Sequence, residues 1–449
     1  MNDILFLSRY GARVASRSRI YGAEWTKVAS PAMTRTGSAV GMTAAAGIGS
    51  QAVTNSFDSA YPWNAIRPET DSLGNTFMRI PKFYIRKTDE ANLYRIEVSG
   101  VQHVGFYLPA CFYDFTNSRE LPYVDFGKHL GSLDGTKLAS KPNVFPLNTK
   151  SIVQFRDYAR ANNAGGLLGY QQLDVHAHDV LSALFTVEFA TLNSQAIMPG
   201  YTTGSYSATH VATAAETGAN RLVLATAFAD TFRVGGSIGI GTSLGGQQVA
   251  INRTITAIDV VDASNKAISF DGAAVNIALG NIIYSTAWKA GFSSGIAAPS
   301  GCITANDGKY PCAYRGIESP WGDIWQFVDG VNINERQAWV AANAADYASN
   351  LFAAPYVQLG YANGSTDNYT TALGYDAASP FAQFPTVNTG GGATTYYSDY
   401  YYSTTGQRIA RVGGNWYLGS AAGLRYWHLG GASSDAGVLI GGRLIRKPL

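Results

Sequence analysis

The stretch YRGIESPWGDIWQFVDGV, residues 314–331, is the most distinctive part of the 449-residue chain. Trp321, Trp325 and Phe327 are large packing side chains, and Gly322 and Gly330 permit tight turns between them. We therefore expect this stretch to form a buried segment of the core.

The closing region, residues 408–447, has the same character. It reads RIARVGGNWYLGSAAGLRYW…VLIGGRLIRK, with two strand-like pieces separated by glycine-rich loops. Further upstream, from residue 61 on, short strand patterns such as TFMRIPKFYIRK prevail. Two helices are predicted there. One spans about 151–163, where Ser151 can cap the start, and one spans about 174–193, where apolar residues recur at helical spacing on most sides.

Residues 205–287 differ from the sequence on either side. Five strand-like runs, RLVLATAF, FRVGGSIGIG, QQVAINRTITAIDVV, AISFDGAAVNIA and NIIYSTA, are separated by Gly, Asn and Asp turns, with no convincing helix. We predict a small all-β domain, a barrel or sandwich, inserted into a host domain. The host then consists of residues 61–204 and 288–449, and residues 1–60 form an extended N-terminal segment.

The composition narrows the class of protein. Hydrophobic residues make up 46 % of the chain, as in a globular protein, whereas charged residues make up only 14 %, against roughly 25 % in average soluble proteins. A surface covered by Ser, Thr, Asn, Gly and Tyr suits an extracellular or assembled-particle protein. The net charge of +2 gives no case for nucleic acid as a partner. The basic residues of the N-terminal segment are expected to be solvated or to face an assembly partner: Arg9, Arg13, Arg17, Arg19, Lys27 and Arg35.

No apolar run is long enough to span a bilayer, and the start MNDILFLSRYGARV lacks the basic and apolar regions of a secretory signal. We expect a protein that is made in the cytoplasm without a signal peptide. A particle released by lysis would reconcile that origin with a surface suited to the outside of cells.

Four groups of residues follow one another in the two C-terminal pieces: Gly322, Asp323, Trp325 and Phe327, then Arg411, Gly413, Gly414 and Trp416, then Arg425, and finally Gly441, Gly442 and Arg443. Their order resembles the C-type-lectin fold, in the version of formylglycine-generating enzymes and of phage receptor-binding proteins of the major-tropism-determinant type. The resemblance implies an α+β, C-type-lectin-like host fold.

The upstream part is similar to phage tail tip and fibre proteins. The motifs that carry this similarity are Trp63, Gly74, Asn75, Met78, IPKFYI (80–85), GFYLPACF (105–112) and LFTVEFAT (184–191). The resemblance implies a virion tail protein that binds a host-cell receptor, either a glycan or a protein, and that is a homotrimer docked to other tail proteins by its N-terminal segment. A purely structural tail component, whose lectin-like module contacts neighbouring subunits, is the alternative.

Departures from these families argue against catalysis and metal binding. Formylglycine-generating enzymes carry a copper-binding cysteine pair in the C-terminal region, and here no cysteine follows Cys312. The calcium-binding tripeptides of sugar-binding lectins are also missing. We expect no enzyme activity, no cofactor and no metal; an oxidase or a glycan hydrolase is the remote alternative. The HAHD sequence at 176–179 is not expected to bind a metal, because side chains at positions i and i+2 of a helix point apart.

The three cysteines, Cys111, Cys302 and Cys312, allow one Cys302–Cys312 bridge.

A tyrosine-rich stretch, TTYYSDYYYSTTGQRIARVGGNWYLGSAAGLRYWHLGG (394–431), is the candidate binding site. Tyr, Ser and Asp together have the composition of antibody paratopes, in which tyrosine gives large rigid contact area. We predict one exposed aromatic surface on this stretch, while contact with a neighbouring subunit and burial in the core remain alternatives. The candidate receptor-binding residues are Tyr396, Tyr397, Asp399, Tyr400, Tyr401, Tyr402, Trp416, Tyr417, Arg425, Tyr426, Trp427 and His428.

Overall fold

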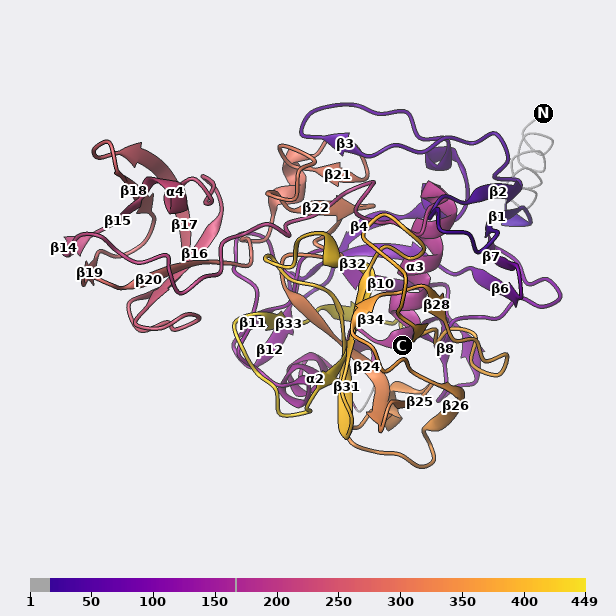
Figure 1. Ribbon diagram of the computed structural model, residues 1–449. Coiled ribbons are helices and arrows are strands. Elements are labelled where there is room, and N and C mark those ends of the chain that lie inside the picture. The colour runs from indigo at the N-terminus through magenta and orange to yellow at the C-terminus, as the bar shows by residue number, and fades with distance from the viewer. Residues whose placement is uncertain (1–16, 166–167) are drawn as a thin grey trace, which may run out of the picture.

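The computed structural model describes residues 17–165 and 168–449, which form a large body and a smaller lobe at its side (Figure 1). Strands account for 37 % of the structure and helices for 11 %, so the fold is mainly β. No helix among the described residues is long and apolar enough to cross a membrane.

The largest sheet of the body carries the C-terminal part of the chain. Its strands are, in spatial order, β26 (Val357–Ala362), β25 (Gln337–Val340), β24 (Trp325–Asn334), β31 (Gln407–Gly413), β32 (Gly423–Gly431), β30 (Tyr400–Ser403) and β27 (Asn368–Tyr369), with β33 (Ile440–Gly441) paired to β24. The stretch 314–331 supplies most of β24, which is buried over nearly its whole length, as the sequence predicts. β24 pairs with β31, with Phe327 opposite Arg411, so the two distinctive pieces of the sequence are adjacent strands.

Smaller sheets surround this one. The first has the order β2 (Thr34–Gly37), β1 (Ile20–Trp25), β7 (Leu93–Ser99) and β6 (Tyr84–Glu90). The second has the order β13 (Tyr170–Gln172), β34 (Leu444–Arg446), β10 (Tyr123–Gly127), β5 (Thr76–Pro81) and β4 (Arg67–Thr70). The third has the order β23 (Ile317–Glu318), β22 (Cys312–Tyr314), β21 (Gly301–Cys302) and β3 (Gly47–Ile48). Two-stranded ladders complete the body: β8 (Tyr113–Asp114) with β9 (Arg119–Glu120), β11 (Ser132–Asp134) with β12 (Lys137–Ala139), and β28 (Ala372–Leu373) with β29 (Pro385–Val387).

Two helices of the body confirm the sequence predictions. α2 (Ile152–Arg160) starts at Ser151, whose side chain and that of Gln154 form a reciprocal capping box. α3 (Val175–Phe189) is capped by Asp174, and every residue of it except Ser182 is buried. α3 ends four residues earlier than predicted, because Ala190 adopts a left-handed conformation that stops the helix. The 3₁₀ helices are η1 (Ser56–Ser59), η2 (Trp63–Ala65), η3 (Ala110–Phe112), η4 (Phe292–Gly295), η5 (Ala344–Asp346) and η6 (Gly419–Ala421).

α3 runs through the central core of the body and is tied to the stretch 314–331 by a buried ion pair. Glu188, near its end, receives hydrogen bonds from Tyr314 Oη at 2.8 Å, Arg315 Nε at 3.1 Å and Asn55 Nδ2 at 2.7 Å. Because Glu188 is fully buried, each of these donors compensates for the water that the carboxylate loses. The motif LFTVEFAT therefore contributes packing residues and one buried carboxylate to the core.

The N-terminal segment, which the sequence predicts to be extended, packs on the body from Ile20 on. β1 lies between β2 and β7, and Tyr21 and Trp25 are buried. The cation of Arg35 lies over the ring of Phe57, at 5.6 Å from its centroid. Residues 1–16, including Arg9 and Arg13, lie outside the described residues.

The lobe covers the region 205–287, and each of the five predicted runs contributes a strand. The run RLVLATAF, however, ends in a one-turn helix that the sequence did not predict. The lobe contains β14 (Glu216–Ala219), β15 (Arg221–Ala225), the one-turn helix α4 (Thr226–Ala229), β16 (Ser237–Gly241), β17 (Ala250–Val260), β18 (Asn265–Phe270), β19 (Val275–Ile277) and β20 (Ile282–Thr286). Five of these strands form one sheet of order β15-β18-β17-β16-β20, and β14 pairs with β19. Their apolar side chains make a core of their own, whose buried members all lie between Ala212 and Ile283.

The two connections of the lobe meet at Asp323 of the body. The Asp323 amide donates to the Tyr201 carbonyl at 2.7 Å, and the Asp323 carboxylate accepts from the Trp288 amide at 2.9 Å. Tyr201 and Trp288 lie on the incoming and the outgoing connection, and their rings pack edge to face at 5.7 Å. One residue of the stretch 314–331 thus fixes both ends of the lobe.

The three cysteines are free and buried, so the proposed Cys302–Cys312 bridge is not formed. The two residues lie directly opposite each other on β21 and β22. Burial raises the pKa of the Cys302 thiol to about 12, and that of Cys312 is raised as well. The thiols are therefore protonated at neutral pH and behave as small apolar side chains.

Candidate functional site

The tyrosines of residues 400–402 are divided between the two faces of β30. Tyr401 is fully buried in the central core, whereas its neighbour Tyr402 is 36 % exposed. Tyr400 lies on the same face as Tyr402 and is half-buried. Successive side chains of a strand point to opposite faces, so three consecutive tyrosines cannot all face solvent.

The predicted exposed surface is therefore wrong for most of its members. Of the twelve candidate residues, seven are buried: Tyr397, Asp399, Tyr401, Trp416, Arg425, Tyr426 and Trp427. Three are half-buried, Tyr396, Tyr400 and His428, and two are exposed, Tyr402 and Tyr417. The structure brings only part of the set together at the surface.

Each buried member has a packing partner that the local sequence does not reveal. The ring of Tyr397 meets that of Trp25 at 5.4 Å, and Tyr396 meets the same indole at 6.2 Å, so the first tyrosine pair is held against the N-terminal sheet. Trp427 packs against Phe384 at 4.8 Å on the core side of the large sheet. These contacts join segments that are far apart along the chain, and they turn candidate binding residues into core residues.

A row of rings remains half-exposed on the outer face of the large sheet, and we call Tyr369, Tyr400, Tyr402 and His428 the tyrosine face. Tyr369 of β27 lies opposite Tyr400 of β30, with ring centroids 5.4 Å apart. Tyr402 lies opposite His428 of β32, and their rings stack at 4.6 Å. The row crosses three neighbouring strands, so strand pairing and not chain order determines its shape.

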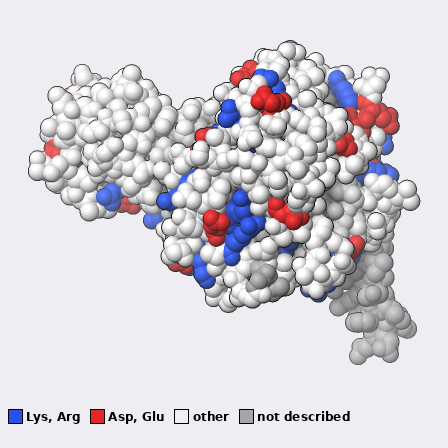
Figure 2. All heavy atoms as spheres, turned by 90° about the horizontal axis from the view of Figure 1, so that it is seen from below, with Lys and Arg blue, Asp and Glu red and all other residues white. Residues whose placement is uncertain are grey.

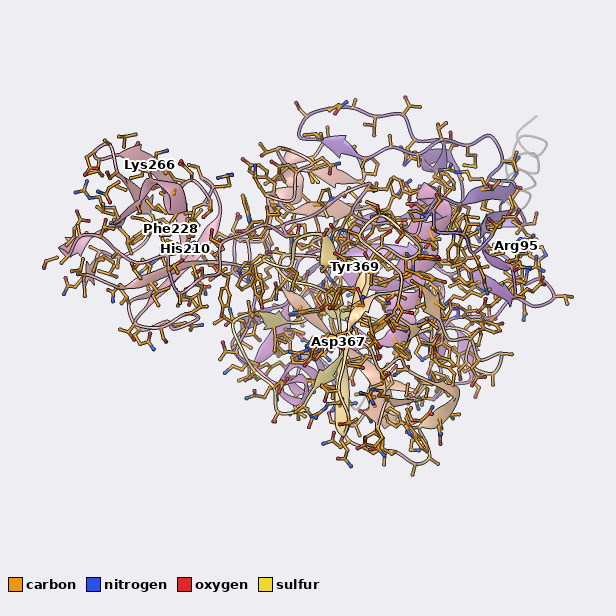
Figure 3. The ribbon with its side chains drawn as sticks, in the orientation of Figure 1. Arg95, His210, Phe228, Lys266, Asp367 and Tyr369 are labelled. Atoms are coloured by element: carbon orange, nitrogen blue, oxygen red, sulfur yellow. The ribbon has the colours of Figure 1, made fainter. Side chains whose placement is uncertain are left out.

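A polar rim borders the tyrosine face. The hydroxyl of Tyr400 donates to the Asp367 carbonyl at 2.9 Å, and the Ser403 amide donates to Asp367 Oδ1 at 3.0 Å. The hydroxyls of Tyr369 and Ser420 lie 3.1 Å apart. Figure 3 shows Asp367 and Tyr369 close together over the large sheet, well away from the lobe that carries His210 and Phe228. Exposed carboxylate and hydroxyl oxygens therefore lie beside exposed ring surface.

The floor under the tyrosine face is rigid. Tyr426 contacts Tyr400 at 5.7 Å and Trp325 at 4.7 Å, and Trp325 contacts His428 at 5.3 Å. Arg411 donates to His428 Nδ1 at 3.2 Å. Burial, and secondarily Arg411, lowers the pKa of His428 to about 3, so its imidazole is neutral. Fixed rings of this kind lose little conformational freedom when a ligand binds.

Tyr417 extends the aromatic surface toward the lobe. It is 41 % exposed and stacks on Tyr206, with centroids 5.0 Å apart and ring planes within 7° of parallel. Tyr206 lies on the incoming connection of the lobe and also contacts Trp416 at 6.1 Å. A ligand that covers Tyr417 would therefore also lie close to the base of the lobe.

Asp399 and Arg425 lie below the sheet surface and not on it. Asp399 Oδ2 accepts from the Arg425 amide at 2.6 Å, and burial raises the pKa of Asp399 to about 8. The carboxyl is thus largely protonated at neutral pH. Both residues support the strand that carries Tyr426 and His428 but cannot touch a surface ligand.

Tyr369 and Asp367 are absent from the sequence-based candidate set. They precede the tyrosine-rich stretch by about thirty residues and join it only because β27 pairs with β30. The short run Asp367-Asn368-Tyr369 has the same Asp and Tyr composition as the predicted site, which is the one signal that could have identified it.

Charged residues do not form a large patch of one sign on the face seen from below, where the body shows scattered charges of both signs and the lobe shows few (Figure 2). Over residues 17–165 and 168–449, no group of three or more His, Cys, Asp or Glu side chains is placed to hold a metal ion. The two histidines of HAHD bind different carbonyls, His176 Nε2 that of Ala341 at 3.1 Å and His178 Nε2 that of Leu424 at 2.9 Å.

Comparison with known proteins gives no further guide, since no protein-family model and no curated protein matches the chain. The function is therefore proposed from the residues of the chain and from their arrangement.

Proposed function

We propose that the chain is a tail protein of a bacteriophage, with a C-type-lectin-like body, and that it binds a host-cell receptor through the tyrosine face and Tyr417. The observation that carries the proposal is the row of half-exposed rings on a rigid floor, with Asp367 at its rim. The order of motifs that resembles phage tail tip and fibre proteins supports the same class, as does the low charge content of 14 %.

The size of the tyrosine face indicates how it would work. A fully buried aromatic side chain covers about 150–250 Å², so five partly exposed rings offer on the order of 300 Å². A stable protein–protein interface needs about 800 Å² from each partner. One copy of this surface would therefore bind weakly. We also propose a homotrimer, as the resemblance to phage fibre proteins implies. Several copies on one particle would bind far more tightly than one through effective concentration.

A binding role is favoured over an oxidase because of the state of the thiols. A cysteine acts as a nucleophile or as a metal ligand through its thiolate. All three cysteines are buried, and burial raises the pKa of each, including Cys111. Protonated, buried thiols of this kind suit packing in the core better than redox chemistry.

The location of the chain can be tested on purified particles. Antibodies against the lobe, which projects from the body, are expected to label the tail in electron micrographs (Figure 1). Mass spectrometry of the same particles should recover the chain in stoichiometric amount. Particles that lack the chain, or label on the head alone, would contradict the proposal.

A purely structural tail component is the rival function. A structural component would also lie in the tail, but adsorption of particles to cells would then not depend on the exposed rings. Variants at Tyr400 and Tyr402 separate the two functions, because a structural role predicts failed assembly and a receptor role predicts normal particles that do not adsorb.

A further inference from the structure

A narrow cavity lies inside the body where α3, β6 and β32 meet the segment 373–383. Its polar lining comes from Lys87, His178, Asp179, Ser182, Gln383 and Arg425. The space open to the centre of a water-sized sphere is about 30 Å³. A single water needs about 10–15 Å³ by this measure, so the cavity has room for one or two waters or for one small ion.

The charges around the cavity do not balance. Lys87 Nζ donates to Asp179 Oδ1 at 2.6 Å, and Tyr107 Oη donates to Asp179 Oδ2 at 2.7 Å, so each oxygen of this carboxylate already has a donor. Arg425 is buried, yet no carboxylate among the described residues lies within 4.0 Å of its guanidinium. Asp399, which binds only its backbone amide, is kept protonated by burial. One positive charge is left without a counter-charge.

Donors also outnumber acceptors at this place. A guanidinium has five N–H donors, and that of Arg425 bonds only to Thr186 Oγ1 and, at 3.4 Å, to the Leu192 carbonyl. The hydroxyl of Ser182 is buried without a hydrogen-bond partner in the described part of the chain. Gln383 accepts from Tyr94 Oη at 3.0 Å through its carbonyl oxygen, and its amide N–H groups make no hydrogen bond to another described residue. The Arg425 guanidinium, the Ser182 hydroxyl and the Gln383 amide all line the cavity, and each therefore has N–H or O–H groups without an acceptor among the described residues.

We propose that this cavity binds one monovalent anion of halide size, such as chloride, between the Arg425 guanidinium, the Ser182 hydroxyl and the Gln383 amide. An anion supplies both the missing charge and an acceptor for every donor, whereas a water must find acceptors for its own two hydrogens. His178 offers no competing charge, since burial lowers its pKa to about 4. A larger oxyanion does not fit the space.

The ion would stabilise the folded chain and not contact the receptor. Arg425 lies in β32, whose other face carries His428 of the tyrosine face, and Ser182 lies in α3. An anion between them would hold the strand against the central helix. Because the cavity lies beneath the sheet, the inference stands or falls independently of the proposed receptor function.

Bromide provides a direct test. Crystals of the full chain soaked in sodium bromide are expected to show an anomalous peak in the cavity, within hydrogen-bonding distance of Arg425 and Ser182. In solution, the Tm should rise with sodium chloride and level off, and it should rise less in sodium gluconate of equal ionic strength.

Two conservative variants keep the test interpretable. Ser182→Ala and Gln383→Ala each remove one uncharged donor and are expected to fold but to show a smaller chloride-specific rise in Tm, while the exposed control Ser264→Ala keeps the full rise. Absence of the anomalous peak would overturn the proposal. A peak without any difference in Tm between chloride and gluconate would overturn it as well, since the site would then be empty at solution concentrations.

Discussion

Tyr401 and Tyr402 are consecutive residues with opposite environments. Tyr401 is fully buried against the central core, and its hydroxyl donates to the Gly364 carbonyl at 3.2 Å, whereas Tyr402 is 36 % exposed and stacks on His428. Because successive side chains of a strand point to opposite faces, the ring of Tyr401 contributes to stability and the ring of Tyr402 lies at the surface. The same residue type therefore has two roles within one tyrosine run.

Alanine substitutions at these two positions should separate the roles. Tyr401→Ala is expected to lower the free energy of unfolding by about 3–5 kcal/mol, because it leaves a cavity in the core. Tyr402→Ala, which removes a mostly superficial ring, is expected to cost about 1 kcal/mol or less. Urea unfolding followed by circular dichroism measures both. Equal losses of stability would contradict the assignment of faces.

The division of the tyrosines shows where sequence reasoning was sufficient and where it was not. Ser151 and Gln154 form a capping box that local spacing alone predicts, and the strand runs of the lobe follow from turn residues between apolar runs. The position of Tyr397 against Trp25 depends instead on a contact across more than 350 residues of chain. Local sequence contains no signal for such pairings.

The same limit explains why the sequence did not select Tyr369. Tyr369, and with it the predicted residue His428, join Tyr400 and Tyr402 through the registers of β27 with β30 and of β30 with β32. The second pairing is parallel, and parallel strands are joined by long connections that no turn motif marks. Composition identified the right region, but only strand register could select the exposed rings.

The carboxyl of Asp399 should make stability depend on pH. Its folded-state pKa is about 8, because it is buried, whereas an ordinary aspartate has a pKa of 3.8. Between these values the folded state holds a proton that the unfolded state has released, so the free energy of unfolding falls as pH rises from about 4 to 8. The slope is at most about 1.4 kcal/mol per pH unit.

Asp399→Asn mimics the protonated carboxyl and should flatten this dependence. Urea unfolding between about pH 5 and pH 7.5 is expected to give a shallower loss of stability in the variant than in the wild type. The matched control Asp367→Asn changes an exposed carboxylate of the rim and should keep the wild-type slope. Identical slopes in wild type and Asp399→Asn would show that the buried carboxyl is ionised throughout.

Excision of the lobe should leave the body folded. The connections run side by side at its base, where the Ser285 amide donates to the Ser205 carbonyl at 2.7 Å, so a short Gly/Ser bridge can replace residues 205–287. The lobe core contains no buried residue of the body. We expect one cooperative melting transition for the shortened chain, and a separate one for residues 205–287 alone. Loss of cooperativity in the shortened chain would mean that the two parts depend on each other.

The buried thiols should react only on unfolding. Cys111, Cys302 and Cys312 are free and buried, so a thiol reagent is expected to modify none in the native chain and all three in guanidinium chloride. A reducing agent should leave the Tm unchanged, because no bridge is present to break. Detection of a single thiol in the unreduced, denatured chain would reveal a Cys302–Cys312 bridge.

The central claim is that the exposed rings bind the receptor, and the adsorption rate of particles carrying Tyr400→Ala and Tyr402→Ala tests it most directly. Exposed binding rings typically cost about 2 kcal/mol each when truncated, and several copies on one particle multiply the effect. We predict particles normal in number and shape whose adsorption to host cells is abolished, with Tyr310→Ala, which alters a ring outside the tyrosine face, as the control that adsorbs normally. Normal particles that adsorb at the wild-type rate would contradict the account.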